Sequence, residues 1–264
     1  MKKETNIGVQ LYMIRDHIGN KAQIRNALHK IKRIGFGGVE LCGFLMDEQE
    51  DWESHVREAG LEVTSLHEIA EDMFADPDQF IKKAKSFGCR NLVAAASVKT
   101  DFRDIKSVKK LAENLNGLGS VFAGEGIELL YHNHNAEFTK LDKNCTAMDV
   151  LIEETDKRLV AFEFDSFWTA AIGANPIDWI RMLKDRIPFY HINDCGVAPG
   201  EPGDLMRSIV GTELGSGILN LYGLVRAAKD MGCENIILET HDNWINNDPF
   251  DSMEASYGCL SNLI

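Results

Sequence analysis

The feature of this chain that most restricts its fold is a regular alternation of short apolar segments with longer amphipathic ones. Short runs of β-branched and aliphatic residues indicate buried strands, whereas apolar residues spaced by three or four indicate helices. Eight strands are predicted, over residues 7–11, 38–41, 63–66, 91–95, 128–132, 160–164, 189–192 and 235–238. Helices are predicted between them, including residues 21–34, 48–59, 77–87, 105–123 and 218–231.

Glycine follows several of these helices and precedes the next strand. Gly35, Gly60, Gly88 and Gly232 all have this position. A helix commonly ends on a residue with positive φ, which glycine adopts without steric cost. The repeated order of helix, glycine and strand is therefore typical of successive βα units.

Eight βα units in 264 residues predict an α/β fold, a single (β/α)8 TIM barrel domain over residues 1–264. The alternative is an open Rossmann-like sheet. That fold usually carries Gly-x-Gly-x-x-Gly after its first strand, and no such motif follows residues 7–11. The barrel is accordingly the preferred prediction.

Composition excludes several classes of protein. The formal net charge of -13 argues against a nucleic-acid partner, because such proteins present basic surfaces to phosphates. No stretch approaches the ~18 apolar residues of a membrane span, and the N-terminus lacks the apolar core of a signal peptide, so a cytoplasmic location is expected. The six cysteines contain no Cys-x-x-Cys pair and are predicted to be thiols.

Polar residues gather at the predicted carboxyl ends of the strands, where barrel enzymes build their active sites. From the first strand to the last they are Gln10, Arg15, Glu40, His67, His132, His134, Glu137, Asp165, His191, Asp194 and Glu239. Imidazoles and carboxylates that converge on one barrel mouth suit Mn²⁺, Co²⁺, Zn²⁺ or Mg²⁺. The sequence therefore predicts a divalent metal site.

Each candidate also has a structural interpretation. A lone histidine such as His67 is more often a structural hydrogen-bonding group than a ligand. A buried carboxylate such as Asp165 is costly without a partner, which favours a ligand role. Trp168 could pack in the core or stack on a sugar. The turn at residues 215–217 after Glu213 could bind an anion through backbone N–H groups.

Several motifs together resemble one known family. They are Gln10-Leu11-Tyr12 with Arg15-Asp16, Tyr131-His132-Asn133-His134 with Glu137-Phe138, Phe164-Asp165-Ser166-Phe167-Trp168, His191-Ile192-Asn193-Asp194 and Glu239-Thr240-His241-Asp242. The chain resembles the xylose isomerase-like TIM barrel superfamily, also described as the sugar phosphate isomerase/epimerase or AP endonuclease 2-type barrels, in a subgroup with Tyr-His-Asn-His. This superfamily includes sugar isomerases, epimerases, inosose dehydratases and endonuclease IV relatives.

The resemblance implies metal ligands after strands 5 to 8. Asp165, His191 and Glu239 match the last three, whereas a histidine cluster stands where the family has a strand 5 glutamate. His134 is the expected fourth ligand, although His132 and Glu137 remain alternatives. The expected catalytic groups are His132, Glu137 and Glu239, and the expected substrate-binding residues are Gln10, Arg15, Glu40, His67, Trp168 and Asp194. Asn193 and Ser216 replace residues that are usually charged in the subgroup.

The predicted function is that of an isomerase or epimerase dependent on one divalent metal ion, Mn²⁺, Co²⁺ or Zn²⁺. It would remove the proton α to a carbonyl of a small-molecule carbohydrate, with an unphosphorylated sugar favoured. A lyase or dehydratase acting on a keto-sugar or inosose would use the same first step. A sugar-binding barrel without catalysis is the non-enzyme alternative. A homo-oligomer is compatible with the sequence, and the acidic charge disfavours DNA repair.

Overall fold

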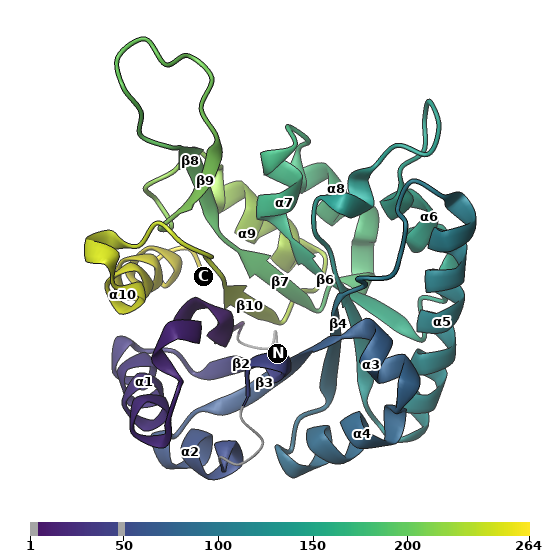
Figure 1. The fold of residues 1–264 in the computed structure, drawn as a ribbon, viewed down its shortest axis with the longest axis horizontal. Coiled ribbons are helices and arrows are strands. Elements are labelled where there is room, and N and C mark those ends of the chain that lie inside the picture. Colours follow the sequence, from purple (N-terminus) through teal and green to yellow (C-terminus); the bar gives the residue numbers. More distant parts are fainter. Residues whose placement is uncertain (1–4, 47–50) are drawn as a thin grey trace.

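The expected barrel is confirmed. The computed structural model describes residues 5–46 and 51–264. Eight parallel strands close into a barrel in the order β1-β10-β7-β6-β5-β4-β3-β2 (Figure 1). Their bounds are β1 Asn6–Gln10, β2 Gly38–Cys42, β3 Glu62–Ile69, β4 Asn91–Ala96, β5 Glu128–His132, β6 Val160–Asp165, β7 Phe189–Ile192 and β10 Asn235–Leu238.

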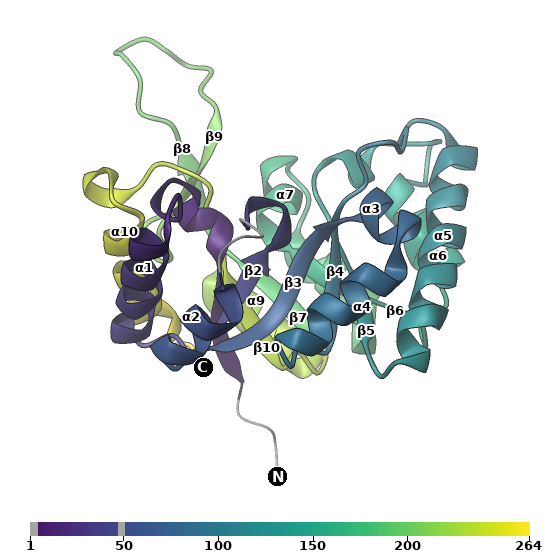
Figure 2. The same ribbon diagram turned by 60° about the horizontal axis from the view of Figure 1, so that its bottom comes forward.

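Helices surround these strands (Figures 1 and 2). They are α1 Lys21–Ile34, α2 Trp52–Ala59, α3 Ala70–Ala75, α4 Pro77–Ser86, α5 Ile105–Gly124, α6 Ala147–Glu154, α7 Ser166–Ala171, α8 Pro176–Leu183, α9 Leu221–Asp230 and α10 Pro249–Leu260. The helix expected from residue 218 begins at Leu221, because the Asn220 side chain caps it by accepting from the Gly223 N–H at 3.0 Å. Residues 48–50 of the expected second helix lie outside the described residues.

The expected glycine positions are confirmed by the backbone. Gly35, Gly60, Gly88 and Gly232 have φ of 126°, 71°, 64° and 93°. These angles are strained for residues with a side chain. The six cysteines are free thiols, as expected, and no helix within residues 5–46 and 51–264 is long and apolar enough to cross a bilayer.

A β-hairpin, not anticipated from the sequence, interrupts the βα order after β7. Strands β8 Asp194–Val197 and β9 Ile209–Thr212 pair antiparallel, with Asp194 opposite Thr212. The hairpin projects well beyond the barrel in both views (Figures 1 and 2). Three residues of β9, Ile209, Val210 and Gly211, form part of a cavity wall.

The barrel interior is closed at its base by a small apolar cluster of Val93, Leu130, Ala161, Phe189 and Ile237. Alternate residues of a strand point to the same face of the sheet. Positions two residues after four members of this cluster therefore also face inward, and they hold His132, Glu163, His191 and Glu239. These four residues form a polar layer directly above the apolar cluster, and the layer is called the polar layer below.

Candidate metal and active site

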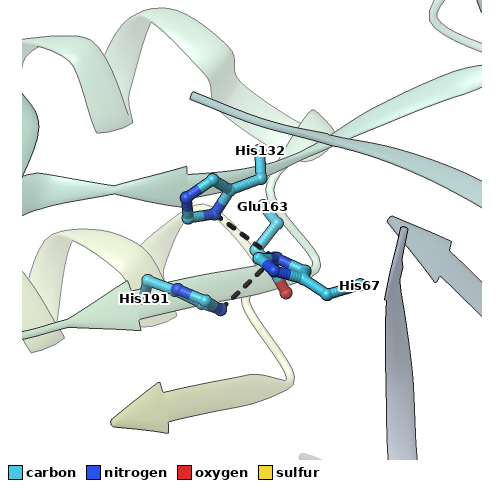
Figure 3. Close-up of side chains that lie close together, drawn as sticks. All are labelled: His67, His132, Glu163 and His191. Atoms are coloured by element: carbon cyan, nitrogen blue, oxygen red, sulfur yellow. Dashed lines mark hydrogen bonds and ion pairs between the residues drawn. The ribbon is translucent and has the colours of Figure 1, made fainter. Parts of the chain in front are cut away.

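Glu163 lies at the centre of the polar layer, with three imidazole rings around it (Figure 3). Its Oε2 is 2.6 Å from His67 Nε2, 3.2 Å from His191 Nε2 and 3.4 Å from His132 Nδ1. Glu163 is fully buried. The sequence interpretation missed it, although Asp165 was placed in the site and strand periodicity puts residue 163 on the same face.

Gln10 and Glu40 were expected to bind substrate, but both lie beneath the cavity. The Gln10 amide donates to Glu40 Oε1 at 2.6 Å, and His191 Nε2 lies 2.8 Å from the same oxygen. Ser65 Oγ donates to the other Glu40 oxygen. Gln10 and Glu40 are fully buried, and neither lines the cavity. Glu40 shares the Nε2 side of His191 with Glu163. In the structure Glu40 contacts His67 and His191, and Gln10 contacts Glu40.

Four residues from neighbouring strands form a compact group of metal-type ligands. Ligand atoms of His132, Asp165, His191 and Glu239 all lie within 4.8 Å of one another, and all four residues are buried. A second group, of His67, His132, Glu163 and His191, shares two of these histidines. Buried imidazoles and carboxylates arranged in this way, in either group, could hold a divalent metal ion.

Asp165 provides a test of the fit. Its Oδ1 accepts from the Phe167 N–H at 2.7 Å and from the Asn193 amide at 3.0 Å. Its Oδ2 is buried with no hydrogen-bond partner in the described part of the chain. An unpaired buried carboxylate oxygen is costly unless a cation or a donor meets it. The donor set therefore fits a divalent cation.

The two strand 5 histidines differ in their relation to the candidate ligand groups. His132 is the last residue of β5 and belongs to both ligand groups, whereas His134 belongs to neither. Between them the Asn133 side chain exchanges hydrogen bonds with the Asp165 backbone, donating at 3.1 Å and accepting at 3.0 Å. This turn displaces His134 towards the cavity, where its ring packs 5.3 Å from Trp168.

Glu137 was expected to be catalytic, but it does not line the cavity. It accepts hydrogen bonds from the Tyr131 hydroxyl at 2.7 Å and from the His134 N–H at 3.0 Å, and it is only 2% exposed. Burial raises the pKa of its carboxyl group. Its contacts hold the turn that carries His134.

Asp194, expected to bind substrate, is occupied by the backbone. Its two oxygens accept from the N–H groups of Cys195, Gly215, Gly217 and Leu219 at 2.9 to 3.1 Å. The N–H groups of Gly215 and Gly217, considered above as a possible anion site, thus donate to a side chain of the same protein. Glu213 accepts from Ser252 and from the Ile245 N–H instead.

Asp194→Asn is expected to lower the free energy of unfolding by about 2–4 kcal/mol, because an NH₂ group would face two backbone donors in a buried site. Urea denaturation measures the difference. Asp230→Asn, which alters an exposed pair with Arg226, is the matched control and should change stability by less than ~0.5 kcal/mol. Equal effects in the two variants would contradict the assigned role.

A cavity of about 690 Å³ opens above the ligand groups. Tyr12 and Arg15, after β1, form one wall with His241, which follows β10. Trp168 of α7 packs 5.3 Å from the His241 ring, and its Nε1 is buried without a hydrogen-bond partner among residues 5–46 and 51–264. His67, His132 and Glu239 reach the cavity from below. Its volume suits a small polyhydroxy molecule.

Burial and close charges shift the pKa values of the site residues. Burial lowers the pKa of His134 to about 4 and raises that of Asp165 to about 6. Burial alone would lower the pKa of His191, but the carboxylates of Glu163, Glu40 and Glu239 raise it well above its ordinary value. His134 lines the cavity, and Asp165 and His191 belong to the ligand group beneath it. Perturbed titratable groups gathered at a cavity are typical of functional sites.

The chain belongs to the xylose isomerase-like TIM barrel family, whose model matches residues 28–262. A curated inosose dehydratase of Clostridium botulinum is 31% identical over 84 residues, which cover 32% of this chain and 27% of that protein. The match thus spans little more than a quarter of that relative.

Solved structures share the fold over nearly the whole chain. A sugar phosphate isomerase/epimerase from Parabacteroides distasonis is 22% identical with a TM-score of 0.76, covering 97% of this chain and 93% of its own. A xylose isomerase-like barrel protein from Mycobacterium smegmatis, in complex with magnesium, is 14% identical with a TM-score of 0.73 and coverages of 98% and 96%. At these identities the likeness concerns the fold.

Proposed function

We propose that the protein is a divalent-metal-dependent isomerase or epimerase of a small carbohydrate, acting by proton transfer at the carbon α to a carbonyl. The observation that carries this proposal is the group of His132, Asp165, His191 and Glu239 beneath the cavity, in which one oxygen of Asp165 has no partner in the part of the chain that the structure describes. These four residues would hold the ion. A divalent ion there would polarise a carbonyl or hydroxyl oxygen of the substrate.

The two sides of His191 support this choice of ligand group over the group that contains Glu163. Its Nδ1 lies 2.8 Å from Glu239, whereas its Nε2 lies 2.8 Å from Glu40 and 3.2 Å from Glu163. Ligand histidines generally donate their second N–H to a carboxylate, which fixes the ring. Glu40 and Glu163 would have this positioning role, and Glu163 remains paired with His67.

His134 and His241 are the proposed proton-transfer groups. Both line the cavity and neither belongs to a ligand group. Each ring packs 5.3 Å from Trp168, and His241 Nε2 lies 3.5 Å from Glu239. Two imidazoles beside one cavity could remove a proton and return it at another position or on another face of the substrate.

A dehydratase is the second candidate, favoured by the curated match to inosose dehydratase. It would remove the same α proton and then expel a β-hydroxyl group as water. His241, next to Glu239, would be the proton donor to that leaving group. The two reactions give products of different mass, so one mass measurement of the product distinguishes them.

The test is incubation of purified, metal-loaded protein with ketoses, aldoses and inososes in deuterated water, followed by mass spectrometry. An isomerase or epimerase incorporates deuterium and conserves the carbon skeleton and hydroxyl count, whereas a dehydratase yields a product lighter by one water. Failure to exchange deuterium into any compound, in protein shown to hold its metal, would contradict the proposed chemistry.

A further inference from the structure

Arg15 lies on the cavity wall with its guanidinium group anchored by neutral groups only. Nη1 donates to the Tyr12 carbonyl at 3.1 Å, and Nη2 donates to the His241 carbonyl at 2.8 Å. Its Cζ is 4.5 Å from the centroid of the Tyr12 ring. A guanidinium has five N–H donors, so three of them remain for another partner.

The absence of a carboxylate partner distinguishes Arg15 from most arginines of this acidic chain. Seven other arginines lie within 4.0 Å of a carboxylate oxygen, for example Arg25 with Glu58 at 3.0 Å. No carboxylate in the described ranges reaches Arg15 at this distance, although Asp242 lines the same cavity. Among the residues that the structure describes, the positive charge of Arg15 is thus fixed in place without a carboxylate partner.

The hydrogen bond from Arg15 to the His241 carbonyl holds the guanidinium charge close to the proposed reaction centre. Arg15 contacts the backbone of His241, whose ring packs 5.7 Å from Tyr12 and whose Nε2 lies 3.5 Å from Glu239. Arg15 and the ligand Glu239 are therefore linked through one residue. A substrate of sugar size can reach both.

The cavity fits a carboxylate better than a phosphate. Arg15 is the sole arginine or lysine among the described residues that line it. One guanidinium carries one positive charge and can balance one carboxylate through two parallel hydrogen bonds, whereas a phosphate dianion carries a second negative charge that no other arginine or lysine in the described lining meets. The turn at residues 215–217 offers no anion site either, because Asp194 already accepts the N–H groups of Gly215 and Gly217.

We infer that the substrate is a carboxylated polyhydroxy compound, such as a sugar acid, whose carboxylate binds Arg15. This inference rests on the proposed function, since it assigns the substrate class of the same cavity. It is tested by binding alone, so that its failure and a failure of the proposed reaction are separate results.

The experiment compares matched probes by isothermal titration and saturation-transfer NMR on intact protein, before and after loading with Mn²⁺. The probes are the uronate, the neutral hexose and the hexose 6-phosphate of the gluco, galacto and manno series. In the wild type, at least one uronate is expected to bind ~10 to 100-fold more tightly than its matched hexose, the range of a charge-assisted hydrogen-bonded pair. This preference should vanish in Arg15→Gln and survive partly in Arg15→Lys.

Arg25→Gln, which removes an exposed arginine, is the matched control and should keep the preference. Metal content and melting temperature are measured on every variant to show that each is folded. The inference is overturned if no uronate binds more tightly than its hexose, if a 6-phosphate binds more tightly than its uronate, or if the preference persists in folded Arg15→Gln.

Discussion

Asp165→Asn is expected to remove the bound metal while leaving the barrel folded. Asparagine can still accept from the Phe167 N–H at the start of α7, where Asp165 caps the helix, so the local structure should persist. Asparagine lacks the negative charge of Asp165 and the second anionic oxygen, which in the wild type has no partner among residues 5–46 and 51–264. Metal affinity should fall by more than ~100-fold, beyond the usual cost of losing an outer hydrogen-bond partner.

The measurement is elemental mass spectrometry of the purified wild type and variant after dialysis against equal metal concentrations. About one divalent ion per chain is expected in the wild type and almost none in Asp165→Asn. Asp104→Asn is the matched control, because Asp104 also caps a helix, α5, far along the chain from the ligand residues. A variant that keeps stoichiometric metal would show that Asp165 is not a ligand.

His134→Gln is expected to slow substrate deuterium exchange by about 10² to 10⁴-fold, the usual contribution of one acid–base group. Metal content should stay unchanged, because His134 lies outside both ligand groups. Burial lowers the pKa of His134 to about 4, so its neutral form is available from mildly acidic pH upwards. The contribution of this residue should therefore be lost only as the pH falls towards 4.

Exchange is measured by mass spectrometry on whichever sugar is active in the wild type, together with metal analysis of the same samples. The control is His29→Gln, which removes an exposed histidine from α1. If His134→Gln keeps its exchange activity, His134 is not the base, and His241 becomes the candidate for that role. Loss of metal in His134→Gln would instead restore His134 as the strand 5 ligand.

Strand periodicity explains why much of the fold and part of the site could be predicted. Eight apolar segments and their helix-ending glycines predict the barrel without any knowledge of contacts. Polar residues at the ends of those strands must then meet at one mouth, and Asp165, His191 and Glu239 do lie together. The same periodicity also places Glu163, two residues before Asp165 in β6, on the inward face.

Other residues depend on contacts that no local pattern encodes. The separation of His132 from His134 follows from the hydrogen bonds of Asn133 with a strand 32 residues away. Asp194 looked like a substrate ligand, but a loop folded back by the β8–β9 hairpin takes both of its oxygens. Gln10 ends β1 as expected, but β2 continues two residues beyond Glu40 to Cys42, and neither Gln10 nor Glu40 lines the cavity.

The sequence by itself determined the barrel and three of the residues that converge at its mouth, because hydrophobic period and strand-end position are local properties of a chain. Only the tertiary structure decided how deep each side chain lies and which partner it has. Arg15 illustrates the difference, since its carbonyl partner His241 is 226 residues away. Burial and pairing arise when distant strands close, and they set the charge and the availability of each group.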